Sequence, residues 1–136
     1  MFNEKNDTNQ IKINTAALLM LVAQADEKIE DAEILSIKEI LIDFFNIDSN
    51  ESDKLILDSQ KLINTSTDVY QIGSIVKDSL SSQDLIDLLC CIFEVAYADK
   101  NLHFMERHII NQIANILNIN KSKILDINKE MKNILL

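Results

Sequence analysis

The sequence predicts an all-α protein, and three observations lead to that class. Apolar residues recur at helical spacing, and no segment shows a sustained alternation of apolar and polar residues. The 136 residues include no proline and one glycine, Gly73, whereas a β-sandwich or barrel needs turn residues about every 8–12 positions. Polar residues typical of helix N-caps precede several apolar stretches. We therefore expect about seven helices and essentially no strand.

The first three helices are expected after a polar tail over residues 1–12. The helix over 13–25 is apolar nearly all round, which is typical of a central helix. A second helix is expected over 30–46. Asp48, followed three positions later by the acid Glu51, predicts the N-cap of a third helix that reaches residue 63.

The remaining helices complete a single domain over residues 13–136. A polar loop precedes the fourth helix, which is expected over 68–80, and Ser81 is expected to cap a fifth that ends near Ala98. The sixth covers about 103–117, with His103 at its N-cap position, and Asn120 caps a seventh that runs to the C-terminus. Tyr70 and Tyr97 are expected at the edge of the core.

An internal repeat relates two parts of the chain. Residues 22–33 align with residues 95–106, and both copies contain Val-Ala-x-Ala-Asp, then an aliphatic residue and a glutamate. The likeness continues from 45–48 to 117–120. Two copies are too few for a solenoid, so the repeat predicts two pseudo-symmetric helical hairpins bridged by the third and fourth helices. The residues expected at the centre of these hairpins are Leu19, Val22, Ala23, Val95 and Ala96.

The turn inside each hairpin is acidic and admits two interpretations. In the structural one, Asp26 and Asp99 accept hydrogen bonds from the turn backbone, while Glu33 and Glu106 reach back to free N–H groups at the next helix start. In the other, the carboxylates bind a divalent cation, because five acids lie within the eight residues 26–33. The candidate ligands are Asp26, Glu30, Glu33, Asp99 and Glu106, and the candidate cations are Ca²⁺, Mg²⁺, Mn²⁺ and Zn²⁺.

Charge and composition exclude several classes of protein. The formal net charge is −9 and the isoelectric point about 4.6, which is the wrong sign for a sequence-independent nucleic-acid binder. A P-loop or a G-x-S-x-G motif needs more than one glycine, and we expect no enzymatic activity. Cys90 and Cys91 lie in an apolar run and are expected to be reduced core thiols. No apolar stretch approaches the ~20 residues of a membrane span, so we expect a cytoplasmic protein.

The duplicated turn resembles that of the TerB-like family, the domain of tellurite-resistance TerB that also forms the N-terminus of the co-chaperone DjlA. The matching motifs lie at 16–19, 26–33, 68–72 and 95–106, where they read Ala-Ala-Leu-Leu, Asp-x-x-Ile-x-x-x-Glu, Asp-Val-Tyr-Gln-Ile and Val-Ala-Tyr-Ala-Asp through to Glu. The resemblance is strongest to small standalone bacterial members. It implies an all-α domain of about seven helices that is linked to stress, binds metal through acidic turn residues and works beside membrane partners.

Two departures from the family pattern shape the functional prediction. Glu27 and Lys100 stand where the family has glycine after the turn aspartate, so a left-handed backbone there is costlier unless Asn101 adopts it. A chain without proline also lacks the His-Pro-Asp tripeptide of a J domain. We expect a non-enzymatic protein-interaction module in the response to tellurite or envelope stress. The alternative is a divalent-metal-binding or metal-sensing protein that uses the acidic turns.

Overall fold

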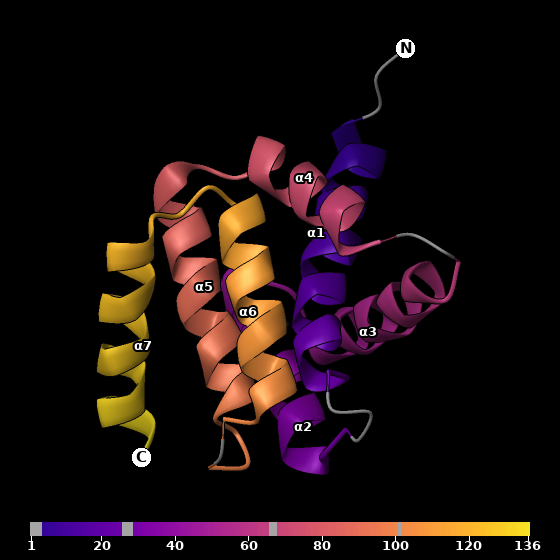
Figure 1. The fold of residues 1–136 in the computed structure, drawn as a ribbon. Helices are drawn as coiled ribbons and strands as arrows, with labels where there is room; N and C mark the ends of the chain where they lie inside the picture. Colours follow the sequence, from indigo (N-terminus) through magenta and orange to yellow (C-terminus); the bar gives the residue numbers. More distant parts are fainter. Residues whose placement is uncertain (1–3, 26–28, 66–67, 101) are drawn as a thin grey trace.

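The part of the chain that the structure describes folds into seven helices, which confirms the predicted all-α class (Figure 1). The structure is a computed structural model and describes residues 4–25, 29–65, 68–100 and 102–136, among which there is no strand. The helices are α1 (Glu4–Ala23), α2 (Asp31–Phe45), α3 (Ser49–Ile63), α4 (Val69–Ser79), α5 (Ser82–Ala96), α6 (Phe104–Ile116) and α7 (Lys121–Leu135). Within these ranges, no helix has both the length and the apolar character to cross a lipid bilayer.

Side-chain caps fix the starts of four helices, as the polar residues in the sequence predict. Asp48 accepts a hydrogen bond from the backbone of Glu51 at 2.8 Å and starts α3. Ser81 accepts from the backbone of Asp84 at 3.1 Å at the start of α5. Asp68 and Asn120 cap α4 and α7 in the same way. Each cap satisfies one of the backbone donors that a helix start leaves unpaired.

The start of α1 differs from the prediction, because the helix begins at Glu4 rather than near residue 13. The residues expected to form a polar tail therefore continue the helix as far as residue 4. No proline or glycine interrupts this stretch, and the exposed residues 8–10 give no apolar period by which the helix could be recognised. Lys12 adds an ion pair to Glu51 of α3, with Nζ and Oε2 3.6 Å apart.

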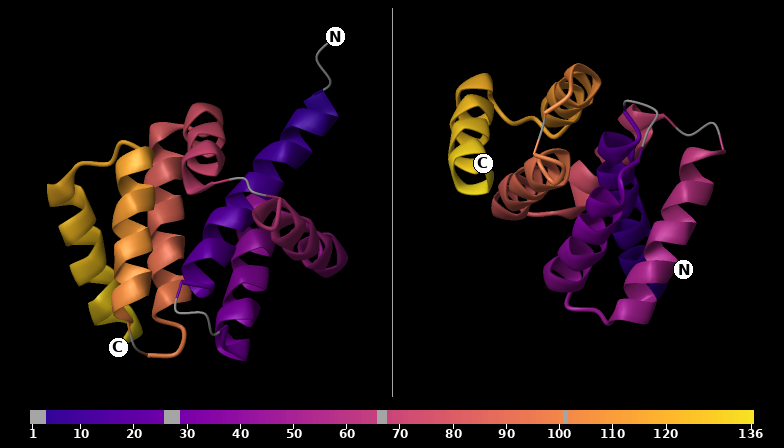
Figure 2. Two further views of the ribbon diagram at one scale, coloured as in Figure 1. Left: turned by 45° about the vertical axis from the view of Figure 1, so that its right-hand side comes forward. Right: turned by 90° about the horizontal axis from the view of Figure 1, so that it is seen from below.

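The two predicted hairpins pack against each other around a shared core. Helices α1 and α2 form one hairpin, α5 and α6 form the other, and α1 contacts both helices of the second hairpin. Helices α3 and α4 pack on α1, whereas α7 packs on α5 at the opposite side of the molecule (Figures 1 and 2). The central positions predicted from the repeat are confirmed as fully buried: Leu19, Val22, Ala23, Val95 and Ala96.

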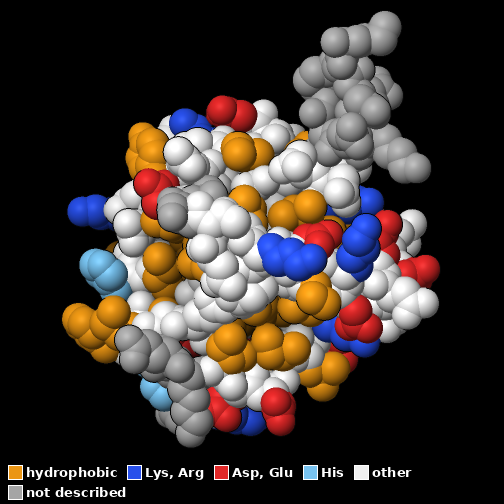
Figure 3. Space-filling model, turned by 90° about the vertical axis from the view of Figure 1, so that its right-hand side faces the viewer, with side chains coloured by type: hydrophobic (Ala, Val, Ile, Leu, Met, Phe, Trp, Pro, Cys, Tyr) orange, Lys and Arg blue, Asp and Glu red, His pale blue; other side chains and the backbone are white. Residues whose placement is uncertain are grey.

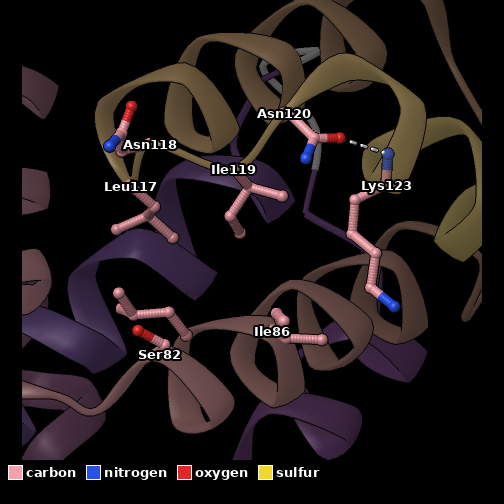
Figure 4. Close-up of a pocket in the computed structure, with 8 residues that line it drawn as sticks. Ser82, Ile86, Leu117, Asn118, Ile119, Asn120 and Lys123 are labelled. Atoms are coloured by element: carbon pink, nitrogen blue, oxygen red, sulfur yellow. Dashed lines mark hydrogen bonds between the residues drawn. The ribbon is translucent and has the colours of Figure 1, made fainter.

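The repeat is also visible in the backbone that ends each hairpin. Asn46 after α2 and Asn118 after α6 have φ of 54° and 62°, the left-handed conformation that often ends a helix. In both turns the next isoleucine donates its N–H back into the helix, from Ile47 to Ile42 at 3.1 Å and from Ile119 to Ala114 at 3.0 Å. The second turn covers a hollow of about 180 Å³ beside α5, whose lining combines aliphatic side chains such as Leu117 and Ile119 with polar ones such as Ser82 and Lys123 (Figure 4).

Helix α4 buries one face and leaves the other exposed. Gly73 allows the close approach of α6, because a Cβ there would lie 2.6 Å from Cγ2 of Ile116. Ile72 and Val76 are buried on the same helix. Tyr70, by contrast, is 68% exposed and Ile75 also reaches the surface, so the expectation that Tyr70 lies at the edge of the core is wrong. Helix α4 contacts α1 and α6 through the face that carries Ile72 and Val76. Tyr70 and Ile75 lie on the other face and remain exposed.

Candidate functional site

The two hairpins bring Glu33 and Glu106 to equivalent positions at the first turns of α2 and α6. Glu33 Oε1 accepts a hydrogen bond from the backbone N–H of Glu30 at 3.0 Å. Glu106 Oε1 accepts from the backbone N–H of His103 at 3.2 Å. These bonds confirm the predicted structural role of both glutamates, and His103 occupies the predicted N-cap position of α6.

The carboxyl groups of Glu33 and Glu106 are buried next to each other. Their residues are 2% and 1% exposed. The pKa of Glu106 is raised to about 8. Burial is the largest cause, the adjoining Glu33 side chain is the next, and the negative charge of Asp99 adds to the shift. The hydrogen bond from the backbone of His103 opposes it. Two buried carboxylates side by side repel each other and lack water, so the pair of carboxyls favours keeping one proton between them.

One oxygen of this pair has no protein partner among the residues that the structure describes. It is Oε2 of Glu106, which is buried and accepts no hydrogen bond. The sequence predicts both glutamates at helix starts but does not predict that they meet. Their contact depends on how the two hairpins pack, and no spacing along the chain encodes that.

A second interaction lies beside the pair, in the turn between α5 and α6. His103 Nε2 lies 3.0 Å from Asp99 Oδ2, and Asp99 is the more buried of the two side chains. Protonation of the imidazole would make this contact an ion pair. This contact thus links Asp99, in the turn after α5, to His103, the N-cap residue of α6.

The predicted metal ligands are only partly brought together. Asp26 lies outside the described residues, as do Glu27 and Asn101. Glu30 is half-buried at the start of α2, close in sequence to Glu33. Over the ranges that the structure covers, no three His, Cys, Asp or Glu side chains cluster as metal ligands would. The described part of the site is therefore a carboxyl pair with Asp99 and His103 alongside.

Lys100 adopts the left-handed backbone that the family's glycine would adopt, with φ of 71°. Its N–H donates to the carbonyl of Tyr97 at 2.8 Å and closes the turn. A side chain in this region costs about 1–2 kcal/mol. This position therefore has a left-handed backbone although its residue is lysine rather than glycine.

We expect Lys100→Gly to stabilise the protein by roughly 1 kcal/mol, because glycine removes most of the left-handed strain. Lys77→Gly is the matched control. Lys77 is exposed within α4, where glycine should cost about 1 kcal/mol. Urea unfolding of both variants measures the difference, and destabilisation by Lys100→Gly would contradict the left-handed turn.

A further acidic hollow of about 250 Å³ lies between α2 and α5, and the sequence alone does not predict it. Its lining includes Glu39, Asp43, Glu94 and Cys91. Burial first, then the charges of Glu39 and Asp43, raise the pKa of Glu94. Burial also raises the pKa of Cys91 to about 12, so its thiol is a poor nucleophile at neutral pH. Glu39 and Asp43 lie one turn apart on α2, whereas Glu94 lies on α5, so the sequence does not link Glu94 to the other two acids.

The fold and the buried pair define a class: an all-α domain built from a duplicated helical hairpin, with an acid at the start of the second helix of each copy. The family described as "Tellurite resistance protein TerB" matches residues 12–129 of the chain. The chain therefore belongs to the TerB family, and the resemblance seen in the sequence is confirmed.

A solved structure supports the fold independently of the family match. A protein of unknown function from Porphyromonas gingivalis W83 superposes with a TM-score of 0.67 over 92% of this chain and 95% of its own. The two chains are 17% identical, so the likeness concerns the fold alone. No curated protein matches the chain.

Proposed function

We propose that the chain is a non-enzymatic TerB-family module that binds a protein partner in the cytoplasm during tellurite or envelope stress. The proposed contact surface is the end of the bundle where α2 and α6 begin, next to Glu33 and Glu106. The partner is expected to be membrane-associated, in keeping with the family resemblance. The observation that carries the proposal is the exposure of large apolar side chains at this end.

Three apolar residues define this surface, which we call the turn-end patch: Ile29, Phe104 and Met105. Phe104 is 78% exposed and Met105 is 48% exposed at the start of α6, and Ile29 is exposed just before α2. The two histidines of the chain flank Phe104 and Met105 in sequence, and Figure 3 shows hydrophobic side chains at the surface beside the histidines. Aromatic residues and methionine are enriched at protein interfaces.

Site-specific photo-crosslinking in the native host tests this proposal. A p-benzoylphenylalanine at position 104 is expected to give a discrete covalent adduct, because the partner covers Phe104. Leu57 on α3 is exposed to a similar degree as Met105 but lies away from the turn-end patch, and the same probe there is the control. Met105→Asp should abolish the adduct at position 104. Equal labelling from positions 57 and 104 would contradict the proposal.

A second candidate function, divalent-cation binding, is favoured by the buried Glu106 Oε2 that has no protein partner in the described ranges. Cations such as Ca²⁺ and Mg²⁺ prefer carboxylate oxygens. Bound metal stabilises only the folded state, so thermal unfolding with chelator and then with Ca²⁺, Mg²⁺, Mn²⁺ or Zn²⁺ tests it. Binding predicts a saturable rise in melting temperature that Glu106→Gln abolishes and that Glu130→Gln on exposed α7 preserves. No rise with any of the four metals would rule this candidate out.

A further inference from the structure

We propose that two copies of the chain pair through the turn-end patch in a twofold-symmetric dimer, which covers the patch until the protein partner displaces the second copy. The inference rests on the proposed function, since it names what regulates access to the same surface. Two features of the described residues carry it. One is the apolar centre of the patch, and the other is the charge on the two helices that present it.

The apolar centre of the contact is formed by the first two residues of α6. Phe104 is 78% exposed, more than any other large apolar side chain that the structure describes, and Met105 follows it at 48%. Ile29 adds to this surface from the segment just before α2. Packing these side chains against their equivalents in a second copy would remove apolar surface from water on both copies at once.

Charges of opposite sign lie on the two helices at this end of the bundle. The α6 half carries exposed Arg107, with exposed Lys100 in the turn before it, and the α2 half carries exposed Asp31, with half-buried Glu30 before it. Among the described residues, neither Arg107 nor Asp31 forms an ion pair within the chain. The helix dipole disfavours a cation close to a helix start, so α6 itself gains no stability from Arg107.

A second copy matches this arrangement because a twofold axis exchanges the two halves. In such an interface residue i of one copy contacts residue j of the other, and j contacts i. An axis through the turn-end patch therefore brings Arg107 of each copy to Asp31 of the other. A partner of a single charge would be repelled by one half. The net charge of −9 on each copy acts mainly at longer range, where salt screens it.

Sedimentation velocity on the purified full chain tests the dimer, in about 0.15 M salt so that long-range repulsion is screened. The wild type is expected to reach twice its mass of 15.5 kDa at concentrations up to about 100 μM, which populate a dimer with a Kd in the micromolar range. Phe104→Asp should leave the chain monomeric, because it places a charge at the centre of the contact.

Exchanging the charges identifies the twofold arrangement. Arg107→Glu and Asp31→Arg should each weaken the dimer by at least about tenfold, because like charges then face each other on both sides of the axis. An equimolar mixture of the two variants should associate again, since every contact between one variant and the other pairs opposite charges. Lys77→Glu and Asp78→Arg make the same changes on exposed α4, at the other end of the bundle (Figure 1). These controls should dimerise like the wild type.

The proposal is overturned by a monomeric wild type, by a dimer that survives Phe104→Asp, or by variants that do not associate when mixed. Its failure is distinct from failure of the proposed function, because sedimentation uses the chain alone. A monomeric chain that still forms an adduct with another protein from position 104 in the host would leave the proposed function standing. Adducts made only of two copies of this chain would support the dimer and contradict the proposed partner.

Discussion

Stability of the wild-type protein is expected to fall as pH rises from about 5 to about 8, and Glu106→Gln is expected to remove part of that slope. The pKa of Glu106 is raised from 4.5 to about 8 in the folded protein. Between these values the folded state keeps a proton that the unfolded state has released. Stability from this group is therefore fully present at low pH and is lost as pH rises through the folded pKa, by about 1.4 kcal/mol per pH unit.

Urea unfolding at pH 5, 6, 7 and 8 measures the effect as the difference between wild type and variant. The difference is needed because the raised pKa of Glu94 contributes a slope of the same sign. Glutamine keeps an oxygen that can accept from the backbone of His103, so Glu106→Gln preserves the cap. Glu130→Gln, on the exposed surface of α7, is the control and should leave the slope unchanged. Equal slopes for wild type and Glu106→Gln would mean that Glu106 ionises normally.

Ala96→Leu is expected to destabilise the protein by roughly 1–3 kcal/mol, because it overpacks the centre of the fold. Ala96 is fully buried at the end of α5, in the place that Ala23 occupies at the end of α1. Small residues at both places let the two hairpins approach each other. Chemical denaturation measures the loss as a lower midpoint with an unchanged dependence on denaturant.

Ala32→Leu provides the matched control for this substitution. Ala32 is exposed on α2, so the same change of side chain there should alter stability by no more than about 0.5 kcal/mol. A neutral result for Ala96→Leu would show that the end of α5 has room for a larger residue. The pseudo-symmetric packing of the hairpins would then be wrong.

Local signals in the sequence predicted most of the fold. Caps such as Asp48 and Ser81 mark where helices begin, and buried alanines in equivalent places of the repeat mark the centre. The start of α1 was missed because its first turns are polar and exposed, with no apolar period. The exposure of Tyr70 was missed because the buried face of a short helix depends on which neighbours it packs against.

The sequence predicts the position of each residue of the candidate site separately. The chemistry of the site, however, depends on Glu33 and Glu106 lying close together in the folded protein. The repeat placed Glu33 and Glu106 at equivalent helix starts, and both make the expected bonds to the backbone. Their burial against each other, and the raised pKa that follows, arise only when the hairpins pack.

The central claim is that the two repeats meet through the buried carboxyls of Glu33 and Glu106. Titration of the Glu106 side-chain carboxyl by ¹³C NMR tests it most directly, in the wild type and in Glu33→Gln. The account predicts an apparent pKa of about 8 in the wild type and a lower value in Glu33→Gln, because a neighbouring carboxyl is lost while burial remains. A wild-type midpoint near the ordinary glutamate value of about 4.3 would contradict it.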